Sequence, residues 1–211
     1  MTIYDLKPAF QNLLRPLCNS LAKAGVTANQ VTIAAAVMSV AVGLLFALFP
    51  TTQWAALLIP VALFIRMALN AIDGMLAREH DMRSDLGGLL NELGDVISDV
   101  ALYLPFALVP GFSRVLVVTV VVLAMLTEMA GVVAVQIGAS RRYDGPMGKS
   151  DRAFVFALLA LLLGIGLSPE WWWADAGLIL VAALAVLTVF NRSTRALREL
   201  AAGVGEEGRK S

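Results

Sequence analysis

Cysteine, histidine and charged residues are scarce in this chain of 211 residues. The single cysteine, Cys18, excludes a disulfide within the chain. The single histidine, His80, lies in a polar segment between apolar runs, where a solvated loop residue is a better interpretation than a catalyst. Charged residues make up 15% of the chain, against about 25% in soluble domains. The formal net charge is zero, so the charge balance gives no indication of nucleic acid binding.

Linkers, internal repeats and low-complexity tracts are also missing. Residues 1–24 lack the early apolar core of a cleavable signal peptide. The sequence therefore predicts a single domain over residues 1–211.

Long apolar runs fill most of the chain: 59% of the residues are hydrophobic and the mean hydropathy is +0.78. Residues 32–49 contain no charge, and further apolar segments follow at 54–78, 86–110, 115–139, 153–169 and 173–191. These runs are too long for barrel strands, and a helix satisfies its own backbone in lipid. The sequence predicts an all-α integral membrane protein with six transmembrane helices in a bundle over residues 29–196.

Basic residues concentrate on one side of this topology. If both termini are cytoplasmic, the outer connections hold only Arg114, and Arg66 lies within a helix. This asymmetry predicts an inner (plasma) membrane protein with both termini inside, and it places Trp171–Trp173 at the outer interface as an aromatic anchor. The basic residues on the inner side are Lys7, Arg15, Lys23, Arg78, Arg83, Arg141, Arg142, Lys149, Arg152, Arg192, Arg195, Arg198, Arg209 and Lys210.

Residues 1–24 have apolar side chains at helical spacing. The pattern predicts an amphipathic helix lying on the cytoplasmic membrane surface, although it also fits a mere helix start. Thr27 or Asn29 is a plausible cap for the first span. The apolar positions are Ile3, Leu6, Phe10, Leu13, Leu14, Leu17 and Leu21.

Ionisable and amide side chains gather near one end of the second and third apolar segments. Such residues are costly inside a membrane and tend to be functional. At about 100° per residue they form one stripe on each helix, and the short loop at 79–85 makes the two helices antiparallel neighbours. We expect the stripes to face each other and to bind a hard divalent cation such as Mg²⁺ through oxygen ligands. They consist of Arg66, Asn70 and Asp73, and of Asn91, Glu92, Asp95 and Asp99.

Small residues accompany these stripes. Gly74, Ala77, Gly87 and Gly88 would let a bulky ligand approach the backbone. Helix packing is the alternative explanation for such glycines, and it suffices for the glycines alone. The acidic stripes beside them favour a pocket.

The order of these residues resembles the signature of the CDP-alcohol phosphotransferase family, Asp-x-x-Asp-Gly-x-x-Ala-Arg and, after a short gap, Gly-x-x-x-Asp-x-x-x-Asp. Residues 70–78 read Asn-Ala-Ile-Asp-Gly-Met-Leu-Ala-Arg, and residues 87–95 read Gly-Gly-Leu-Leu-Asn-Glu-Leu-Gly-Asp. Six spans with the motif between the second and third also resemble the family's layout. The resemblance therefore covers nearly the whole chain.

The resemblance implies a transferase of phospholipid biosynthesis that displaces CMP from a CDP-linked lipid with a polar alcohol. It further implies one or two Mg²⁺ or Mn²⁺ ions and a homodimer in the membrane. By position, Asp73 would ligate metal, and Asp95 would ligate metal and act as general base. The nucleotide would lie against Asp73, Gly74, Ala77, Arg78 and Gly87.

Two positions depart from the signature, because Asn70 and Asn91 stand where the family has aspartate. An amide oxygen still ligates Mg²⁺, but it brings no charge. One hypothesis is an active site with one ion, or with two if Glu92 is recruited as a ligand. The rival hypothesis is a paralogue that binds CDP-lipid or nucleotide and metal without turnover.

A second basic cluster follows the fourth span. Lys149 and Arg152 lie one turn apart at the start of the fifth helix, where side chains and helix N-terminus would bind the phosphate of an acceptor. Arg192 after the last span is a weaker candidate for the same site. Positive-inside topology and attraction to anionic lipid are the alternative, and they suffice for Arg141 and Arg142. Glu128, a lone carboxylate in the fourth span, requires a partner, for which Arg66 or a polar group of the site is expected.

Two other classes of protein are weighed against a lipid-synthesising enzyme. A transporter would carry ions on its buried acids, but these cluster at one face and no broken-helix pair recurs in two halves. A regulatory protein derived from the enzyme family would bind metal and nucleotide without turnover. The sequence does not identify the acceptor, although its basic residues favour a phosphorylated or anionic one.

Overall fold

The computed structural model describes the backbone of residues 3–169 and 171–207 and the side chains of residues 8–169 and 172–202. The predictions made for the side chains of Ile3, Leu6, Lys7 and Trp171, and for Arg209 and Lys210, lie outside the described residues.

All secondary-structure elements of the described residues are helices, as predicted. Four helices are long and apolar enough to span a membrane: α2, α3, α5 and residues 172–202 of α7. The predicted six-span layout also needs α4, which carries the acidic stripe, and α6, which has 16 residues. The elements are α1 (Ile3–Lys23), α2 (Ala28–Leu48), α3 (Gln53–Glu79), α4 (Asp85–Tyr103), the 3₁₀ helix η1 (Leu104–Leu108), α5 (Arg114–Gln136), α6 (Lys149–Gly164) and α7 (Trp171–Glu207).

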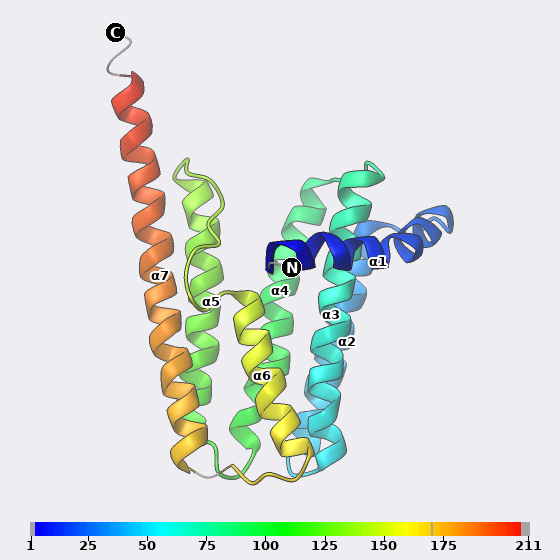
Figure 1. Ribbon diagram of the computed structural model, residues 1–211, viewed down its shortest axis with the longest axis vertical. Coiled ribbons are helices and arrows are strands. Elements are labelled where there is room, and N and C mark those ends of the chain that lie inside the picture. Colours follow the sequence, from blue (N-terminus) through cyan, green and yellow to red (C-terminus); the bar gives the residue numbers. More distant parts are fainter. Residues whose placement is uncertain (1–2, 170, 208–211) are drawn as a thin grey trace.

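The helices α2 to α7 form an upright bundle, and α1 lies across it (Figure 1). Helix α2 packs against α3 and α4, α3 also packs against α6, and α5 packs against α7. The α3–α4 and α5–α6 connections and the far end of α7 lie at the end of the bundle nearer α1, and the α2–α3, α4–α5 and α6–α7 connections lie at the opposite end.

Hydrogen bonds at two helix starts tie α2 to α4. The Thr27 hydroxyl accepts from the backbone N–H of Gln30 at 3.3 Å, and the Gln30 side chain accepts from the Thr27 N–H at 3.0 Å, which is a capping box. Of the two predicted caps, Thr27 is therefore confirmed. Asn29 instead donates to the hydroxyl of Ser84 at 3.4 Å, and Ser84 caps α4 by accepting from the Gly87 N–H at 3.0 Å.

Helix α1 packs on the end of α3. Cys18 is fully buried in a small apolar cluster with Ile72 and Met75 of α3, and Arg15 donates to Glu79 at 2.5 Å. The predicted helix is confirmed, and one of its faces contacts the protein. Leu13 is 75% exposed on another face, so the expected contact with the membrane surface stays a prediction.

The buried thiol gives a direct test of this docking. Burial and the charge of Glu79 raise the pKa of Cys18, so little thiolate is present at neutral pH. We expect a maleimide to label Cys18 at least tenfold more slowly in the folded protein than after unfolding in SDS. Equal labelling rates in the two states would show that α1 does not dock on α3 through this thiol.

Candidate functional site

The polar stripes of α3 and α4 face each other, as predicted. Arg66 of α3 donates to Asp99 at 2.5 Å and, through its other terminal nitrogen, to the carboxylate of Asp95 at 3.3 Å and its backbone oxygen at 3.0 Å. The Asn70 amide donates to the same Asp95 carboxylate at 3.4 Å. The two helices meet here through side chains, while α2 packs along both of them.

A cavity of about 440 Å³ opens between the starts of α2 and α4 and the end of α3. Asp73, 4% exposed, lies in its wall and accepts a hydrogen bond from Thr32 of α2 at 2.8 Å. Arg78 is exposed and lines the same cavity. The motif residues that line it are Asn70, Asp73, Gly74, Ala77, Arg78, Gly87, Gly88 and Asn91.

The glycines of this cavity differ in what a side chain would meet. A Cβ on Gly87 would lie 2.7 Å from the Asn29 amide oxygen and 3.1 Å from the Ser84 hydroxyl, so it would push against the contact between α2 and α4. A Cβ on Gly74 would lie 3.2 Å from the flexible Arg78 guanidinium, and one on Gly88 would meet open space. Asn29 and Ser84 therefore approach Gly87 too closely for a side chain there, whereas Gly88 has room for one.

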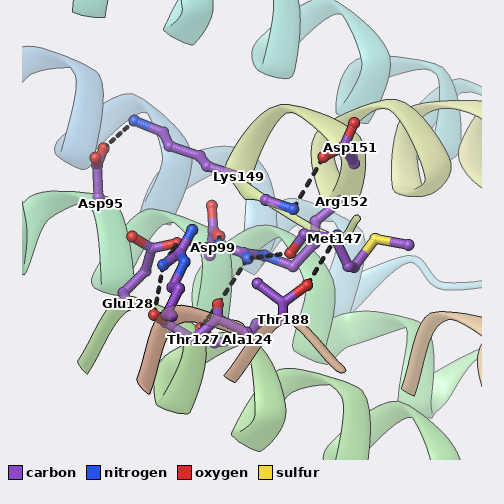
Figure 2. A network of polar contacts seen from close by, with 12 residues as sticks. Asp95, Asp99, Ala124, Thr127, Glu128, Met147, Lys149, Asp151, Arg152 and Thr188 are labelled. Carbon is purple, nitrogen blue, oxygen red and sulfur yellow. Dashed lines mark hydrogen bonds and ion pairs between the residues drawn. The ribbon is translucent and has the colours of Figure 1, made fainter. Parts of the chain in front are cut away.

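Asp95 lies beside this cavity and contacts two basic side chains. Lys149, at the first position of α6, donates from its ammonium to Asp95 Oδ1 (Figure 2). Arg66 approaches the same oxygen from α3. The Asp95 side chain is 19% exposed and that of Lys149 is 31% exposed, so both remain accessible to a ligand.

Arg152 is fully buried and its terminal nitrogens contact protein groups on three sides. It donates to Asp99 at 3.0 Å, to Glu128 at 2.9 Å and to the Thr127 hydroxyl at 2.8 Å, as Figure 2 shows. It thereby joins α4, α5 and α6. The phosphate contact predicted for Arg152 stays a prediction, but its guanidinium faces carboxylates here.

Arg192 of α7 lies in the same network. It is 1% exposed, donates to the backbone oxygen of Thr127, and lies 3.5 Å from a carboxylate oxygen of Glu128. Arg152, Arg192 and Arg141 all form ion pairs with Glu128. A buried partner for Glu128 was expected, but Arg66 is not it, because Arg66 pairs with Asp95 and Asp99.

Arg141 has a structural role that the sequence did not indicate. Its Nε and Nη2 atoms donate to the two carboxylate oxygens of Glu92 at 3.0 and 2.7 Å, and Nη2 lies 3.2 Å from Glu128. Burial lowers the pKa of Arg141, but the hydrogen bonds and charges of Glu92 and Glu128 outweigh it and raise the pKa. Glu92 thus faces Arg141, and its predicted role as a metal ligand stays a prediction.

Gly131 of α5 makes room for Arg141. A Cβ at this position would lie 1.5 Å from Arg141 Nη1 and 2.7 Å from the backbone oxygen of Arg142. Replacing Gly131 by alanine is therefore expected to displace Arg141 from Glu92 and to lower the free energy of unfolding by about 1–3 kcal/mol. Thermal unfolding in detergent measures the change.

The matched control is Gly177→Ala in α7, where a Cβ would meet nothing within 4 Å. Alanine is the better helix former, so this control is expected to be neutral or to stabilise by up to about 1 kcal/mol. Equal effects of the two substitutions would contradict the packing of Arg141 on Gly131.

A second, larger hollow adjoins Asp95 on the side of α6. It measures about 550 Å³ between α3 and α6, and its walls are mostly apolar. Arg66, Asn70, Lys149 and Ser150 contribute its polar groups. The Asn70 side chain therefore borders both hollows. The apolar lining consists of Pro60, Leu63, Phe64, Met67, Ala153, Phe154 and Ala157.

Comparison with known proteins agrees with this arrangement. Residues 25–190 match the CDP-alcohol phosphatidyltransferase family. The chain belongs to this family. A relative, the inner membrane protein YnbA of Escherichia coli K12, is 47% identical over 193 residues, which span 91% of this chain and 94% of that protein. Together with the four apolar helices, this likeness supports an integral membrane protein.

Solved structures of phosphatidylinositol phosphate synthase (PgsA1) from Mycobacterium tuberculosis share the fold of this family member. The structure with CDP-DAG bound is similar with a TM-score of 0.72 at 21% identity, covering 86% of this chain and 92% of that one. The complex with manganese and citrate gives a TM-score of 0.72 at 22% identity, covering 86% and 88%. At these identities the likeness shows the fold.

Proposed function

We propose that this chain transfers a phosphatidyl-type group from a CDP-linked lipid to a polar alcohol and releases CMP. The observation that carries the proposal is the juxtaposition of the motif cavity with Asp95. In that cavity Asp73, Gly74, Ala77, Arg78 and Gly87 converge, and Asn70 links its wall to Asp95 through a hydrogen bond. Family membership supports a transferase of phospholipid synthesis.

The two hollows suit the two halves of such a donor. The motif cavity measures about 440 Å³ and has Arg78 and Arg83 in its lining, which gives it the size and charge for a nucleoside diphosphate. The apolar hollow between α3 and α6 suits acyl chains arriving from the bilayer. Asn70 lies between them, where the pyrophosphate would join the two halves.

Asp95 is the proposed general base. It removes the proton from the acceptor hydroxyl, whose oxygen attacks the phosphorus bonded to the lipid. A bond forms between that oxygen and the phosphorus, the bond from the phosphorus to the CMP oxygen breaks, and CMP leaves with the bonding electrons. Arg66 donates to both the side chain and the backbone of Asp95 and so orients the carboxylate.

A divalent cation, Mg²⁺ or Mn²⁺, would neutralise charge on the pyrophosphate when bound. Within the described ranges, no three His, Cys, Asp or Glu side chains converge to hold a metal, and Asn70 and Asn91 stand where the family signature has two acids. The oxygen donors present still fit one ion, with Asp73 supplying charge and the asparagine amides supplying neutral ligands. Asp95 and Glu92, the other two predicted ligands, already pair with Lys149 and Arg141, respectively.

The acceptor is proposed to approach along Lys149. Its ammonium lies on Asp95 at the open edge of the site and would hold a phosphate of a phosphorylated alcohol beside the base. Arg152 and Arg192 belong to the same proposed acceptor site, where their ion pairs with Glu128 would fix the loop before α6. We further propose cytoplasmic termini, a cytoplasmic site and a homodimer.

The test is CMP release by protein reconstituted in liposomes with Mg²⁺ or Mn²⁺, CDP-diacylglycerol and a panel of phosphorylated and neutral alcohols. CMP release that requires both metal and one acceptor is the expected result. Asn70 and Asn91 favour one alternative, a paralogue that binds CDP-lipid without turnover. Binding of CDP-diacylglycerol without CMP release for any acceptor would support that alternative.

A further inference from the structure

The charges around Asp73 and Asp95 are balanced unequally. Asp95 Oδ1 accepts from Lys149, from Arg66 at 3.3 Å and from the Asn70 amide at 3.4 Å. Asp73 accepts from the neutral hydroxyl of Thr32 at 2.8 Å, and within the part of the chain that the structure describes no basic side chain forms an ion pair with it. Asp95 is therefore paired directly with protein cations, whereas Lys149 acts on Asp73 only at longer range, through its charge.

The two asparagines of the signature line the cavity together with Asp73. With aspartate at positions 70 and 91, three carboxylates would line the cavity and a fourth, Asp95, would lie beside it, and fixed cations alone would balance them poorly. With asparagine, two remain, and the ammonium of Lys149 already contacts one of them. Since like charges repel at contact distance, a divalent ion on Asp95 would have to displace both Lys149 and the neighbouring Arg66.

Buried contacts fix Arg66 beside Asp95. Its side chain is 3% exposed and its other terminal nitrogen donates to Asp99 at 2.5 Å. Asp99 in turn pairs with the fully buried Arg152 at 3.0 Å. Arg66 is thus fixed beside Asp95 by the core, whereas Lys149, with 31% of its side chain exposed, is able to shift toward an incoming phosphate.

We propose that Lys149, supported by Arg66, takes the place of one divalent cation in this chain, so that the site binds at most one metal ion, on Asp73. The inference rests on the proposed function, because the Lys149 ammonium would neutralise the substrate phosphates in place of the missing ion.

Counting bound Mn²⁺ by electron paramagnetic resonance of the free ion tests this without turnover. The purified wild-type chain is expected to bind no more than one Mn²⁺. In Asn70→Asp/Asn91→Asp a second ion is expected to bind weakly, and adding Lys149→Met is expected to tighten that second ion at least tenfold. If Lys149 only stabilised the fold, its replacement would leave metal affinity unchanged or weaken it.

The matched control adds Arg195→Met to the same double variant, because Arg195 pairs with Asp144 and does not line the cavity. It is expected to leave the second affinity within about twofold. Two ions bound to the wild-type chain would overturn the proposal. An affinity for the second Mn²⁺ that Lys149→Met leaves unchanged would also overturn it. At most one ion without CMP release would refute only the proposed function, and CMP release with two ions would refute only this inference.

Discussion

Replacing Asp95 by asparagine is expected to lower the rate of CMP release by about 10²–10⁴-fold, the usual contribution of a general base. The amide keeps the size of the side chain but does not accept the proton of the attacking hydroxyl. Arg66 still donates to the Asp95 backbone oxygen, so the local fold is expected to persist. Initial rates at saturating donor and acceptor measure the change.

Asp85→Asn is the control, because Asp85 lies in the first turn of α4 and is exposed. Its rate is expected to stay within twofold of the wild-type rate. An Asp95→Asn variant that unfolds like the wild type and retains more than a tenth of its rate would contradict the assignment of the base.

Replacing Arg152 by methionine is expected to lower the free energy of unfolding by about 3–5 kcal/mol, because breaking a buried ion pair leaves its partners without compensation. Here the partners are Asp99 and Glu128, whose side chains are 7% and 10% exposed. Titration with SDS in mixed micelles measures the loss. Arg152→Lys keeps the charge and is expected to recover part of it if the methionine variant does not fold.

Arg195→Met provides the matched control. Arg195 pairs with Asp144 at 2.6 Å, but its side chain is 60% exposed, and such surface pairs contribute about 0–1 kcal/mol. A loss for Arg152→Met as small as that for Arg195→Met would contradict its role as the central contact of α4, α5 and α6.

The sequence predicted the helices better than it predicted their contacts. The long apolar runs became α2, α3, α5 and α7, since length and hydropathy are local properties. The segment expected at 86–110 is helical as α4 only to Tyr103 and then continues as the 3₁₀ helix η1, which contains Pro105 near its start. That proline was the signal in the sequence for the change.

The facing stripes were also predictable, because the spacing of Arg66, Asn70 and Asp95 fixes their direction on each helix. The partners of the arginines were not. Arg141 and Arg152 were assigned from their position beside a span, but their contacts with Glu128 depend on how α5 and α6 pack. The glycine that makes room for Arg141 lies ten residues earlier, at Gly131, and only three-dimensional packing brings the two together.

The stoichiometry of the reaction tests transfer most directly. Protein in liposomes would receive CDP-diacylglycerol labelled in the lipid phosphate, Mn²⁺ and the acceptor that supports CMP release, and CMP and labelled lipids would be counted together. We predict one new phospholipid carrying the label for each CMP, with no CMP when acceptor is omitted. Labelled phosphatidic acid formed without acceptor would reveal hydrolysis, and unchanged donor bound to folded protein would reveal binding without turnover; either result would contradict the transferase.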